Sequence, residues 1–394
     1  MKKKIGLLLN SEPQDGGKFQ YNLAMLDAVS SLPAGKFSVI VGYTSDSWSR
    51  YLNSYNLQTV FVPKGFFGRA FARLWIVLGL PIETFRRICP YLLPIAKTLM
   101  RKECDLWIFP SPDAWSYLIP VPALVSIYDL MHLYEGQFPE VSANGEYQRR
   151  ERHYRNINRW SKAFLVDSKI GRQHVMESYG FKLERIHILP YIAPKYIYSH
   201  QTPDNFDSVY NLPEKFIFYP AQFWEHKNHK LLIRAIKRLK PEIPDIKLVL
   251  VGSQKNGYKS TSKLVQDLNL TNDVLFLGYV PEEDITEIYR RARAMIMPTF
   301  FGPTNIPPLE AMATGCPAAI SNVYGMTEQV GNAALSFDPS SEEEIADAIM
   351  RLWTDDHLCS DLSRKGKIRD QNWRQTHFNK RLENILTEIL PVDK

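Results

Sequence analysis

The stretch AMIMPTFFGPTNIPPLEAMATG, residues 294–315, contains the clearest fold signal in the chain. Its first five residues form a short apolar run suited to a buried strand, and a turn rich in Gly, Pro, Thr and Asn follows. The two successive prolines then suit the first turn of a helix, where a missing amide hydrogen costs little. Thr304 or Asn305 can cap this helix, and Gly315 can end it. The stretch therefore predicts a strand–turn–helix unit of an α/β domain.

The same alternation of apolar runs and helical stretches extends over the whole chain. The predicted strands of the first half are Ile5–Leu9, Phe37–Val41, Thr59–Val62, Leu106–Phe109, Leu124–Tyr128, Phe164–Val166 and Ile186–Leu189. Those of the second half are Phe216–Tyr219, Lys247–Val251, Val274–Leu277, Ala294–Pro298, Ala318–Ser321 and Leu335–Phe337. Continuous apolar strands between helices predict two parallel sheets, each covered on both faces. Ligand sites in such domains lie at the carboxyl ends of the strands.

Length and composition fit a globular, two-domain protein. The chain has 394 residues, of which 45% are hydrophobic and 23% charged. Its four cysteines stand far apart without a CxxC pair, which argues against a zinc site or a disulfide framework. The start, MKKKIGLLLN, has too short an apolar run for a signal peptide, and no run reaches the ~18 apolar residues of a membrane span. We therefore expect a cytoplasmic protein.

Charge is distributed unevenly along the chain. Residues 1–200 contain 25 Lys and Arg against 16 Asp and Glu, whereas the remainder contains 23 against 26. Within the basic half, residues 64–102 combine eight Lys and Arg with one acidic residue and many aromatic and aliphatic side chains. A surface of this kind can lie on anionic lipid, which predicts peripheral contact with a membrane; the alternative is a pair of helices with a solvated basic face. The modest basic excess and the absence of a recognition motif argue against nucleic-acid binding.

Two segments of the second half suit an anionic ligand. Free amides in the first turn of the helix after residue 305, with the positive end of its dipole, favour a diphosphate, and Glu310 can accept hydrogen bonds from ribose hydroxyls. In FYPAQFWEHKNH, residues 218–229, Lys227 precedes a helix start, where a cation is unfavourable unless it meets an anion. His226 and His229 flank it, but no carboxylate and histidine set completes a metal site. The alternatives are a well-capped helix and a solvated loop lysine.

Two weaker signals lie in the first half. Gly16 and Gly17 follow the first strand and allow close approach of the backbone to a ligand, although a glycine pair is more often only a turn. A dinucleotide fingerprint is absent, because the segment is not G-x-G-x-x-G. Asp129 and His132 follow another strand at its carboxyl end, where ligand contacts collect; a lone pair of this kind is more often structural.

Taken together, these motifs resemble the retaining glycosyltransferase family 4, which belongs to glycosyltransferase group 1 and has the GT-B fold. The resemblance covers nearly the whole chain and is strongest over residues 216–339, where "PPLEAMA-G-P" and "EQVGNAA…DP" are similar to family motifs. It implies two Rossmann-like domains facing a central cleft. The expected divisions are an N-terminal acceptor domain at 1–195, a linker at 196–213, a C-terminal donor domain at 214–372, and a helix at 373–394 that packs back on the first domain.

The resemblance also implies residue roles. Lys227 would bind the donor diphosphate and stabilise the leaving group, Glu310 would hold the ribose, and Asp129 and His132 would face the transferred sugar. The donor-binding set implied is Gly16, Gly17, Gln222, Lys227, Gly302, Thr304, Asn305, Ile306 and Glu310. No Asp-x-Asp motif is present, so we expect metal-independent chemistry with no cofactor.

Three departures from the family pattern define the subgroup with the motif FGPTNIPPLEA. Gln222 stands where the family has its diphosphate-binding Arg, so Lys227 would carry more of that charge. Gly302 replaces the first Glu of the Glu-x7-Glu element, and Tyr128 replaces the histidine that often precedes Asp129. These changes leave open altered sugar choice or low activity.

The function expected is transfer of a hexose of mannose, rhamnose or glucose type from a GDP-, UDP- or dTDP-linked donor. The acceptor would be a glycan or a lipid-linked oligosaccharide, as in bacterial surface polysaccharide synthesis (O-antigen, capsule or lipopolysaccharide). The resemblance implies retention of the anomeric configuration. Because no carboxylate is a convincing nucleophile, we expect front-face substitution, with the diphosphate assisting deprotonation of the acceptor. Two rivals remain: a GT-B sugar-nucleotide epimerase, and a non-catalytic protein that binds a nucleotide sugar, the latter motivated by Gly302 and Gln222.

Overall fold

The computed structural model describes residues 2–63, 65–198, 202 and 204–391. The chain divides into two compact units. The first unit comprises residues 1–128, 149–190 and 375–394, and the second comprises residues 129–148 and 191–374. Parts of some predicted segments lie outside the described residues: Met1, Lys64 of the basic segment, residues 199–201 and 203 of the predicted linker, and residues 392–394.

The first unit is built on a seven-stranded parallel sheet with the order β3-β2-β1-β4-β5-β6-β7. Its strands are β1 (Lys3–Leu9), β2 (Phe37–Tyr43), β3 (Gln58–Phe61), β4 (Leu106–Phe109), β5 (Ala123–Ser126), β6 (Ala163–Val166) and β7 (Ile186–Ile188). Its helices are α1 (Gly17–Ser30), α2 (Ser49–Leu52), α3 (Phe66–Val77), α4 (Ile82–Leu92), α5 (Pro94–Arg101), α6 (Trp115–Leu118), α9 (Glu146–Trp160), α10 (Lys169–Tyr179) and α19 (Gln375–Ile389). Helix α9 begins in the part of the chain that groups with the second unit.

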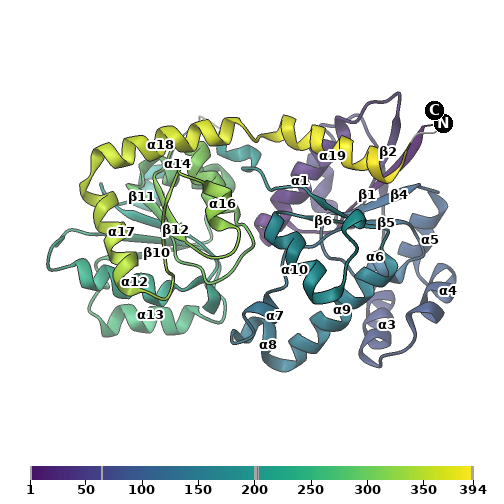
Figure 1. Cartoon of the computed structure of the whole chain (residues 1–394), viewed down its shortest axis with the longest axis horizontal. Helices are drawn as coiled ribbons and strands as arrows, with labels where there is room; N and C mark the ends of the chain where they lie inside the picture. Colours follow the sequence, from purple (N-terminus) through teal and green to yellow (C-terminus); the bar gives the residue numbers. More distant parts are fainter. Residues whose placement is uncertain (1, 64, 199–201, 203, 392–394) are drawn as a thin grey trace. The chain divides into compact units, whose positions relative to one another are not determined.

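The second unit is built on a six-stranded parallel sheet with the order β10-β9-β8-β11-β12-β13. Its strands are β8 (Ile217–Pro220), β9 (Leu248–Val251), β10 (Val274–Gly278), β11 (Ala294–Met297), β12 (Ala318–Ser321) and β13 (Leu335–Phe337). Its helices are α7 (Met131–Tyr134), α8 (Pro139–Ser142), α11 (Phe206–Tyr210), α12 (His229–Leu239), α13 (Tyr258–Asp267), α14 (Glu282–Arg291), α15 (Ile306–Thr314), α16 (Met326–Val330), α17 (Glu342–Thr354) and α18 (Asp356–Gln371). Figure 1 shows strands and helices alternating along the chain in both units.

Burial explains why the strands could be found from apolar runs. The central strands β4, β5 and β6 of one sheet, and β9, β11 and β12 of the other, are buried at every residue. The edge strand β3 is largely exposed. A strand covered by helices on both faces needs apolar side chains throughout, so the two-domain parallel architecture predicted from the sequence is confirmed.

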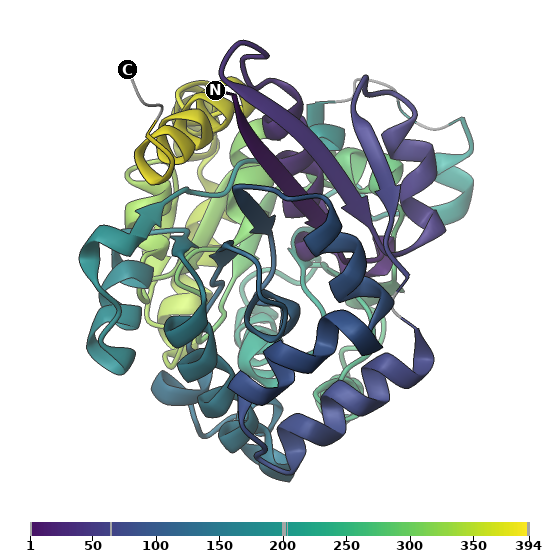
Figure 2. The ribbon, with the colours of Figure 1, turned by 90° about the vertical axis from the view of Figure 1, so that its right-hand side faces the viewer.

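Three segments show how the chain is divided between the units. Residues 129–148 group with the second unit, although the strands on either side of them in sequence belong to the first. The predicted linker contains the 3-10 helix η5 (Lys195–Tyr198) and α11, whose Ile197 and Phe206 are buried in the second core. Helix α19 belongs to the first unit and packs against α1 (Figures 1 and 2).

Helices α3, α4 and α5 come between β3 and β4 and form a group in Figure 2. These helices are formed by most of the described residues of the basic segment 64–102. Within the described residues, no helix has the length and apolar character needed to cross a membrane.

Candidate functional site

The loop after β8 holds Lys227 close to the carboxyl end of the second sheet. Residues 221–224 leave the strand, and Glu225–Lys227 form the 3-10 helix η6. The Lys227 carbonyl accepts a hydrogen bond of 2.8 Å from the Tyr219 hydroxyl. Asn228 follows in the left-handed region and donates to the carbonyls of Pro298 at 2.9 Å and Pro339 at 2.8 Å. Helix α12 begins at His229, so the structure places Lys227 just before a helix start.

The Lys227 ammonium is an unusual cation. Nζ donates to the side-chain oxygen of Asn305 at 3.1 Å, and no carboxylate of the described chain lies within ion-pair distance of it. Burial lowers the pKa of Lys227 to about 8, although the nearby carboxylates of Asp129 and Glu140 oppose this shift. A cation that is taken out of water without direct pairing destabilises the free protein. An ammonium of this kind suits a site that receives an anion.

The side chain of Asn305 does not cap the helix as predicted. It stands at the N-cap of α15, but its side chain makes no capping hydrogen bond. Its side-chain oxygen instead accepts from Lys227, and its backbone is held by Gln329 through bonds of 3.1 and 2.6 Å. The prediction that Asn305 or Thr304 caps the helix with its side chain is therefore wrong for Asn305. The predicted end of the helix is confirmed, because Gly315 lies at the C-cap with φ of 80°.

Gly302 leaves the space that the Asn305 side chain occupies. Its φ is +146°, and a Cβ built on it would lie 2.2 Å from Asn305 Nδ2. A side chain at position 302 would therefore displace Asn305. In this chain the neutral amide of Asn305, rather than a carboxylate at position 302, lies beside the ammonium.

The start of α15 offers fewer amide donors than a typical anion-binding helix. Ile306 begins the helix and is followed by two prolines, which have no amide hydrogen. The Asn305 amide already donates to Gln329. The described hydrogen bonds leave the Ile306 amide as the first-turn donor, so positive charge at this end depends more on Lys227 and the helix dipole.

Glu310 is buried within the second core, at 5% exposure. One carboxylate oxygen accepts from the Tyr289 hydroxyl at 2.6 Å, and the other accepts from the Tyr196 hydroxyl. Burial raises the pKa of Glu310, and the two tyrosine hydrogen bonds oppose that shift. Both oxygens are thus engaged, and a ribose hydroxyl would have to replace one tyrosine to reach the carboxylate.

Residues 129–148, which we call the arm, bring Asp129 into the second unit. Asp129 accepts a hydrogen bond of 2.9 Å from the Met131 amide at the start of α7. Its charge acts on both Lys227 and His226, so these residues are neighbours. His132 is buried, and its ring packs edge-on against Tyr147 at 5.5 Å, also within the arm.

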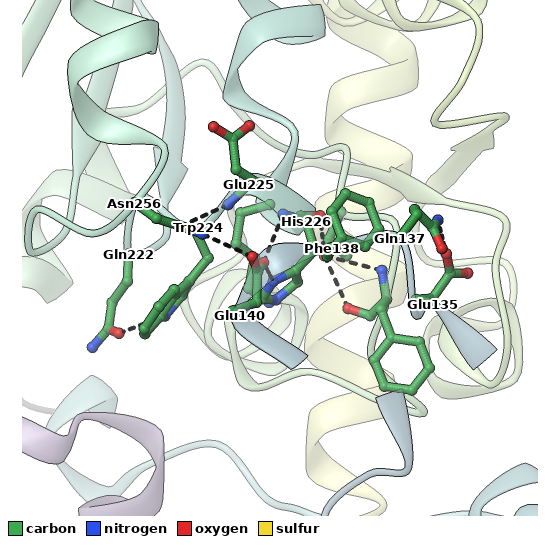
Figure 3. Close-up of polar contacts among 12 residues, drawn as sticks. Glu135, Gln137, Phe138, Glu140, Gln222, Trp224, Glu225, His226 and Asn256 are labelled. Carbon is green, nitrogen blue, oxygen red and sulfur yellow. Dashed lines mark hydrogen bonds and ion pairs between the residues drawn. The ribbon is translucent and has the colours of Figure 1, made fainter. Parts of the chain in front are cut away.

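The arm also contributes a carboxylate that the sequence did not single out. Glu140 accepts hydrogen bonds from the His226 amide at 3.0 Å, from His226 Nδ1, and from Asn256 Nδ2 at 2.9 Å (Figure 3). Burial opposes ionisation, but these donors hold the pKa of Glu140 at about 2. Burial lowers the pKa of His226, and the bond to Glu140 opposes the shift. The pair is therefore a carboxylate and a neutral imidazole near neutral pH.

The remaining predicted residues lie in two places. The side-chain oxygen of Gln222 accepts from Trp224 Nε1 at 3.0 Å within the loop after β8 (Figure 3). Gly16 and Gly17 lie in the first unit at the start of α1, where Gly16 has φ of +60° and a Cβ would meet nothing within 4 Å. Conformation, rather than crowding, accounts for a glycine at position 16.

The structure thus gathers Asp129, Lys227 and Asn305 in the second unit and adds Glu140 and His226. It directs His132 and Glu310 towards aromatic partners. Over the part of the chain that the structure describes, no group of three or more His, Cys, Asp or Glu side chains is arranged to hold a metal ion. The four cysteines are buried and unpaired.

Each of the two units is an α/β domain with a parallel sheet, as in the GT-B fold, and the second carries an ammonium beside a helix start. Residues 201–369 match the family model described as "Glycosyl transferases group 1". That part of the second unit therefore has the sequence features of this family.

Two curated relatives agree with the family match. The chain is 26% identical over 248 residues to mannosylfructose-phosphate synthase of Agrobacterium fabrum, which covers 59% of this chain and 55% of the relative. It is 28% identical over 202 residues to O-antigen chain mannosyltransferase B of Escherichia coli, which covers 50% of this chain and 52% of the relative. The chain thus spans about half the length of these relatives.

A solved structure agrees with the fold over nearly the whole chain. Anabaena Alr3699/HepE, in complex with UDP and glucose, has a TM-score of 0.73 and 17% identity. The alignment covers 98% of this chain and 99% of that one. At this identity the similarity establishes the fold alone.

Proposed function

We propose that this protein is a retaining glycosyltransferase that moves a hexose from a nucleoside-diphosphate sugar to a glycan or lipid-linked acceptor. The observation that carries the proposal is Lys227: a half-buried ammonium, bonded to a neutral amide, beside the start of α15. Desolvation costs the free protein stability, and the negative charge of a diphosphate would offset that cost. The mannosyltransferase relatives support a hexose donor and a role in O-antigen or related surface polysaccharides.

The proposed reaction needs the leaving diphosphate to be stabilised as its bond to the sugar breaks. Lys227 would neutralise charge that develops on the bridging phosphate oxygen, and the α15 dipole would add to this potential. The bond from the anomeric carbon to that oxygen breaks, and the acceptor oxygen bonds to the same face of the carbon. The acceptor proton passes to the departing phosphate, so no protein nucleophile is consumed. Asp129 would support positive charge on the sugar in the transition state.

Ribose binding by Glu310 is part of the same proposal and requires one of its present hydrogen bonds to break. Because both of its oxygens accept from tyrosines, the Tyr196 hydroxyl would have to yield to the ribose. We also propose that catalysis is metal-independent, with Lys227 in the role that a divalent cation has in other transferases.

The proposed acceptor is lipid-linked, and exposed apolar side chains on α3, on α4 and in the segment between them support that choice. The large exposed apolar residues here are Leu74 (56%), Val77 (62%), Leu78 (61%), Leu80 (39%), Tyr91 (88%) and Leu92 (58%). The exposed Arg73 and Arg87 lie on the same helices. Apolar side chains together with arginines suit the surface of an anionic bilayer.

The test of the reaction is release of nucleoside diphosphate from GDP-mannose, UDP-glucose and dTDP-rhamnose, with and without a lipid-linked oligosaccharide fraction. Acceptor-dependent release that is lost in Lys227→Ala but retained in Lys230→Ala supports the proposal. Lys230 is the matched control because it lies three residues further on and pairs with Glu225 at 2.9 Å. Epimerised donor without acceptor would favour the epimerase, and binding without turnover would favour a binding protein.

The test of the surface is flotation with vesicles that contain anionic lipid. Val77→Ser with Leu78→Ser is expected to weaken binding at least about tenfold, because burial of each side chain contributes about 1.5–3 kcal/mol. The variant Val209→Ser is the control, since Val209 is similarly exposed at 56% in the second unit. Binding that is equal in all three proteins, or that is absent in the wild type, would contradict a membrane-docking surface.

A further inference from the structure

Two polar contacts among the described residues join the arm, residues 129–148, to the rest of the second unit. At one, the Tyr324 hydroxyl donates to Glu135 at 2.6 Å, near a small buried cluster of Met131, Val141 and Phe301. At the other, Glu140 meets His226 and Asn256 (Figure 3). The first contact joins two side chains that are both partly exposed. The second buries a carboxylate, at 7% side-chain exposure, and so calls for an explanation.

Glu140 is buried without a Lys or Arg partner in the described chain. Its three hydrogen-bond donors are one amide of the backbone, one side-chain amide and a histidine ring. Replacing such a group with an apolar side chain of similar volume is often neutral or stabilising, so stability alone is a weak reason for its presence. What Glu140 does achieve is to fix the orientation of the His226 ring.

The hydrogen bond also fixes which nitrogen of His226 carries the proton. An ionised carboxylate only accepts hydrogen bonds, so Nδ1 donates and Nε2 is left with its lone pair. His226 Nε2 has no hydrogen-bond partner among the described residues, and the side chain is 13% exposed. The ring is also packed edge-on against Phe138 of the arm at 6.1 Å, so it is held from two sides.

His226 is adjacent in sequence to Lys227 in the 3-10 helix η6, and three charges act on its ring. They are Glu140 and Asp129 of the arm and Lys227, the next residue in its own loop. A ring nitrogen with a lone pair does not bind a phosphate oxygen, because neither atom brings a hydrogen. It does favour a hydroxyl group, which is the hydrogen-bond donor that the sugar half of a nucleotide sugar offers.

We propose that His226 is a sugar-binding residue whose Nε2 accepts a hydrogen bond from a hydroxyl of the transferred sugar, and that Glu140 is its positioning residue. This inference rests on the proposed function of the Lys227 site. It divides the recognition of the donor between adjacent residues: Lys227 for the diphosphate and His226 for the sugar.

The test compares binding of nucleoside diphosphate with binding of the matching sugar nucleotide. GDP, UDP and dTDP, and then GDP-mannose, UDP-glucose and dTDP-rhamnose, are titrated into wild type and His226→Ala. The variant is expected to bind the diphosphate within about twofold of wild type. It should lose about tenfold or more in kcat/KM for the sugar nucleotide, the usual effect of removing a partner from a buried polar group.

The pH dependence of kcat/KM in Glu140→Gln tests whether Glu140 positions the His226 ring or only attaches the arm. Below the pKa of His226 the ring is protonated at Nε2 and can no longer accept, so kcat/KM is expected to fall on the acid side. Loss of the Glu140 charge lowers that pKa further, so the acid limb of the variant should move to lower pH while kcat/KM itself falls. Tyr324→Phe removes the other arm contact and serves as the control, with the acid limb expected to stay in place.

The outcomes distinguish this inference from the function on which it rests. A wild type that binds none of the diphosphates or sugar nucleotides overturns both. Normal turnover with unchanged kcat/KM in His226→Ala, or an acid limb that moves equally in Glu140→Gln and Tyr324→Phe, overturns the inference and leaves the proposed function standing.

Discussion

Replacing Lys227 with methionine should make the free protein more stable while it abolishes nucleotide binding. Methionine has a similar length and no charge, so Lys227→Met removes the desolvated ammonium. Burial lowers the pKa of Lys227 from 10.5 to about 8, with Asp129 and Glu140 opposing the shift. At about 1.4 kcal/mol per pKa unit, the charged form costs the folded state about 3 kcal/mol.

Part of this gain is lost again in the variant. The side-chain oxygen of Asn305, which accepts from Nζ at 3.1 Å, loses its donor. A polar group left without its partner costs about 1 kcal/mol at a half-buried position. We therefore expect Lys227→Met to be about 2 kcal/mol more stable than wild type near pH 7, a rise in Tm of about 4–8 °C for a unit of this size.

The difference in unfolding free energy between Lys227→Met and wild type should depend on pH. Because the pKa of Lys227 is lower in the folded than in the unfolded state, the unfolded state binds more protons between about pH 8 and pH 10.5. Wild-type stability therefore rises relative to the variant across that window, and the gap between them closes. Urea unfolding followed by fluorescence at about pH 7 and about pH 9.5 measures the gap.

The same variant should lose its thermal shift with nucleoside diphosphate. The reasoning is refuted if Lys227→Met is less stable than wild type near pH 7, or if the gap stays constant between the two pH values. Either result would mean that the ammonium is well solvated or well paired and is not held ready for an anion.

Three further predictions concern Glu310, Gly302 and metal ions. Tyr196→Phe should destabilise the fold by about 1–2 kcal/mol, since Glu310 loses a hydrogen bond, yet bind nucleoside diphosphate more tightly because one oxygen is freed for ribose; unchanged affinity in calorimetry would indicate a structural Glu310. Gly302→Ala should lower the free energy of urea unfolding by about 1–3 kcal/mol and weaken nucleotide binding. The added Cβ would lie 2.2 Å from Asn305, in a backbone conformation with φ of +146°. A variant as stable as wild type would show that Asn305 can move freely. Transferase activity should be unaffected by EDTA or added Mg²⁺, and a loss that Mg²⁺ restores would refute the role proposed for Lys227.

Much of the fold could be predicted because local sequence determined it. Each buried central strand is a continuous apolar run, and Gly315 ends α15 in a conformation that favours glycine. Some predicted helix boundaries differ from those in the structure where local signals were ambiguous. Helix α15, for example, begins at Ile306 rather than at the prolines. The position of Lys227 before a helix start was also visible from the sequence, because it follows from the strand and helix on either side.

The rest of the site depends on contacts between distant residues. Glu140 and His226 are 86 residues apart, and Tyr196 and Glu310 are 114 apart. Nothing in the local pattern around Glu140 marks it as a partner of the loop after β8. Likewise, the sequence showed that Gly302 lacks a carboxylate but not that Asn305 fills the space. Such roles follow from packing, which is fixed only when the two parts of the chain come together.

We propose above all that the second unit binds a nucleoside diphosphate through Lys227. The measurement that tests it most directly is calorimetric titration of GDP, UDP, dTDP and ADP into wild type, Lys227→Met and Lys230→Ala. Wild type and Lys230→Ala are expected to bind one nucleotide selectively, with affinity that falls as the pH rises through about 8, whereas Lys227→Met is expected not to bind it. Equal binding by all three proteins, or no binding by wild type, would contradict it.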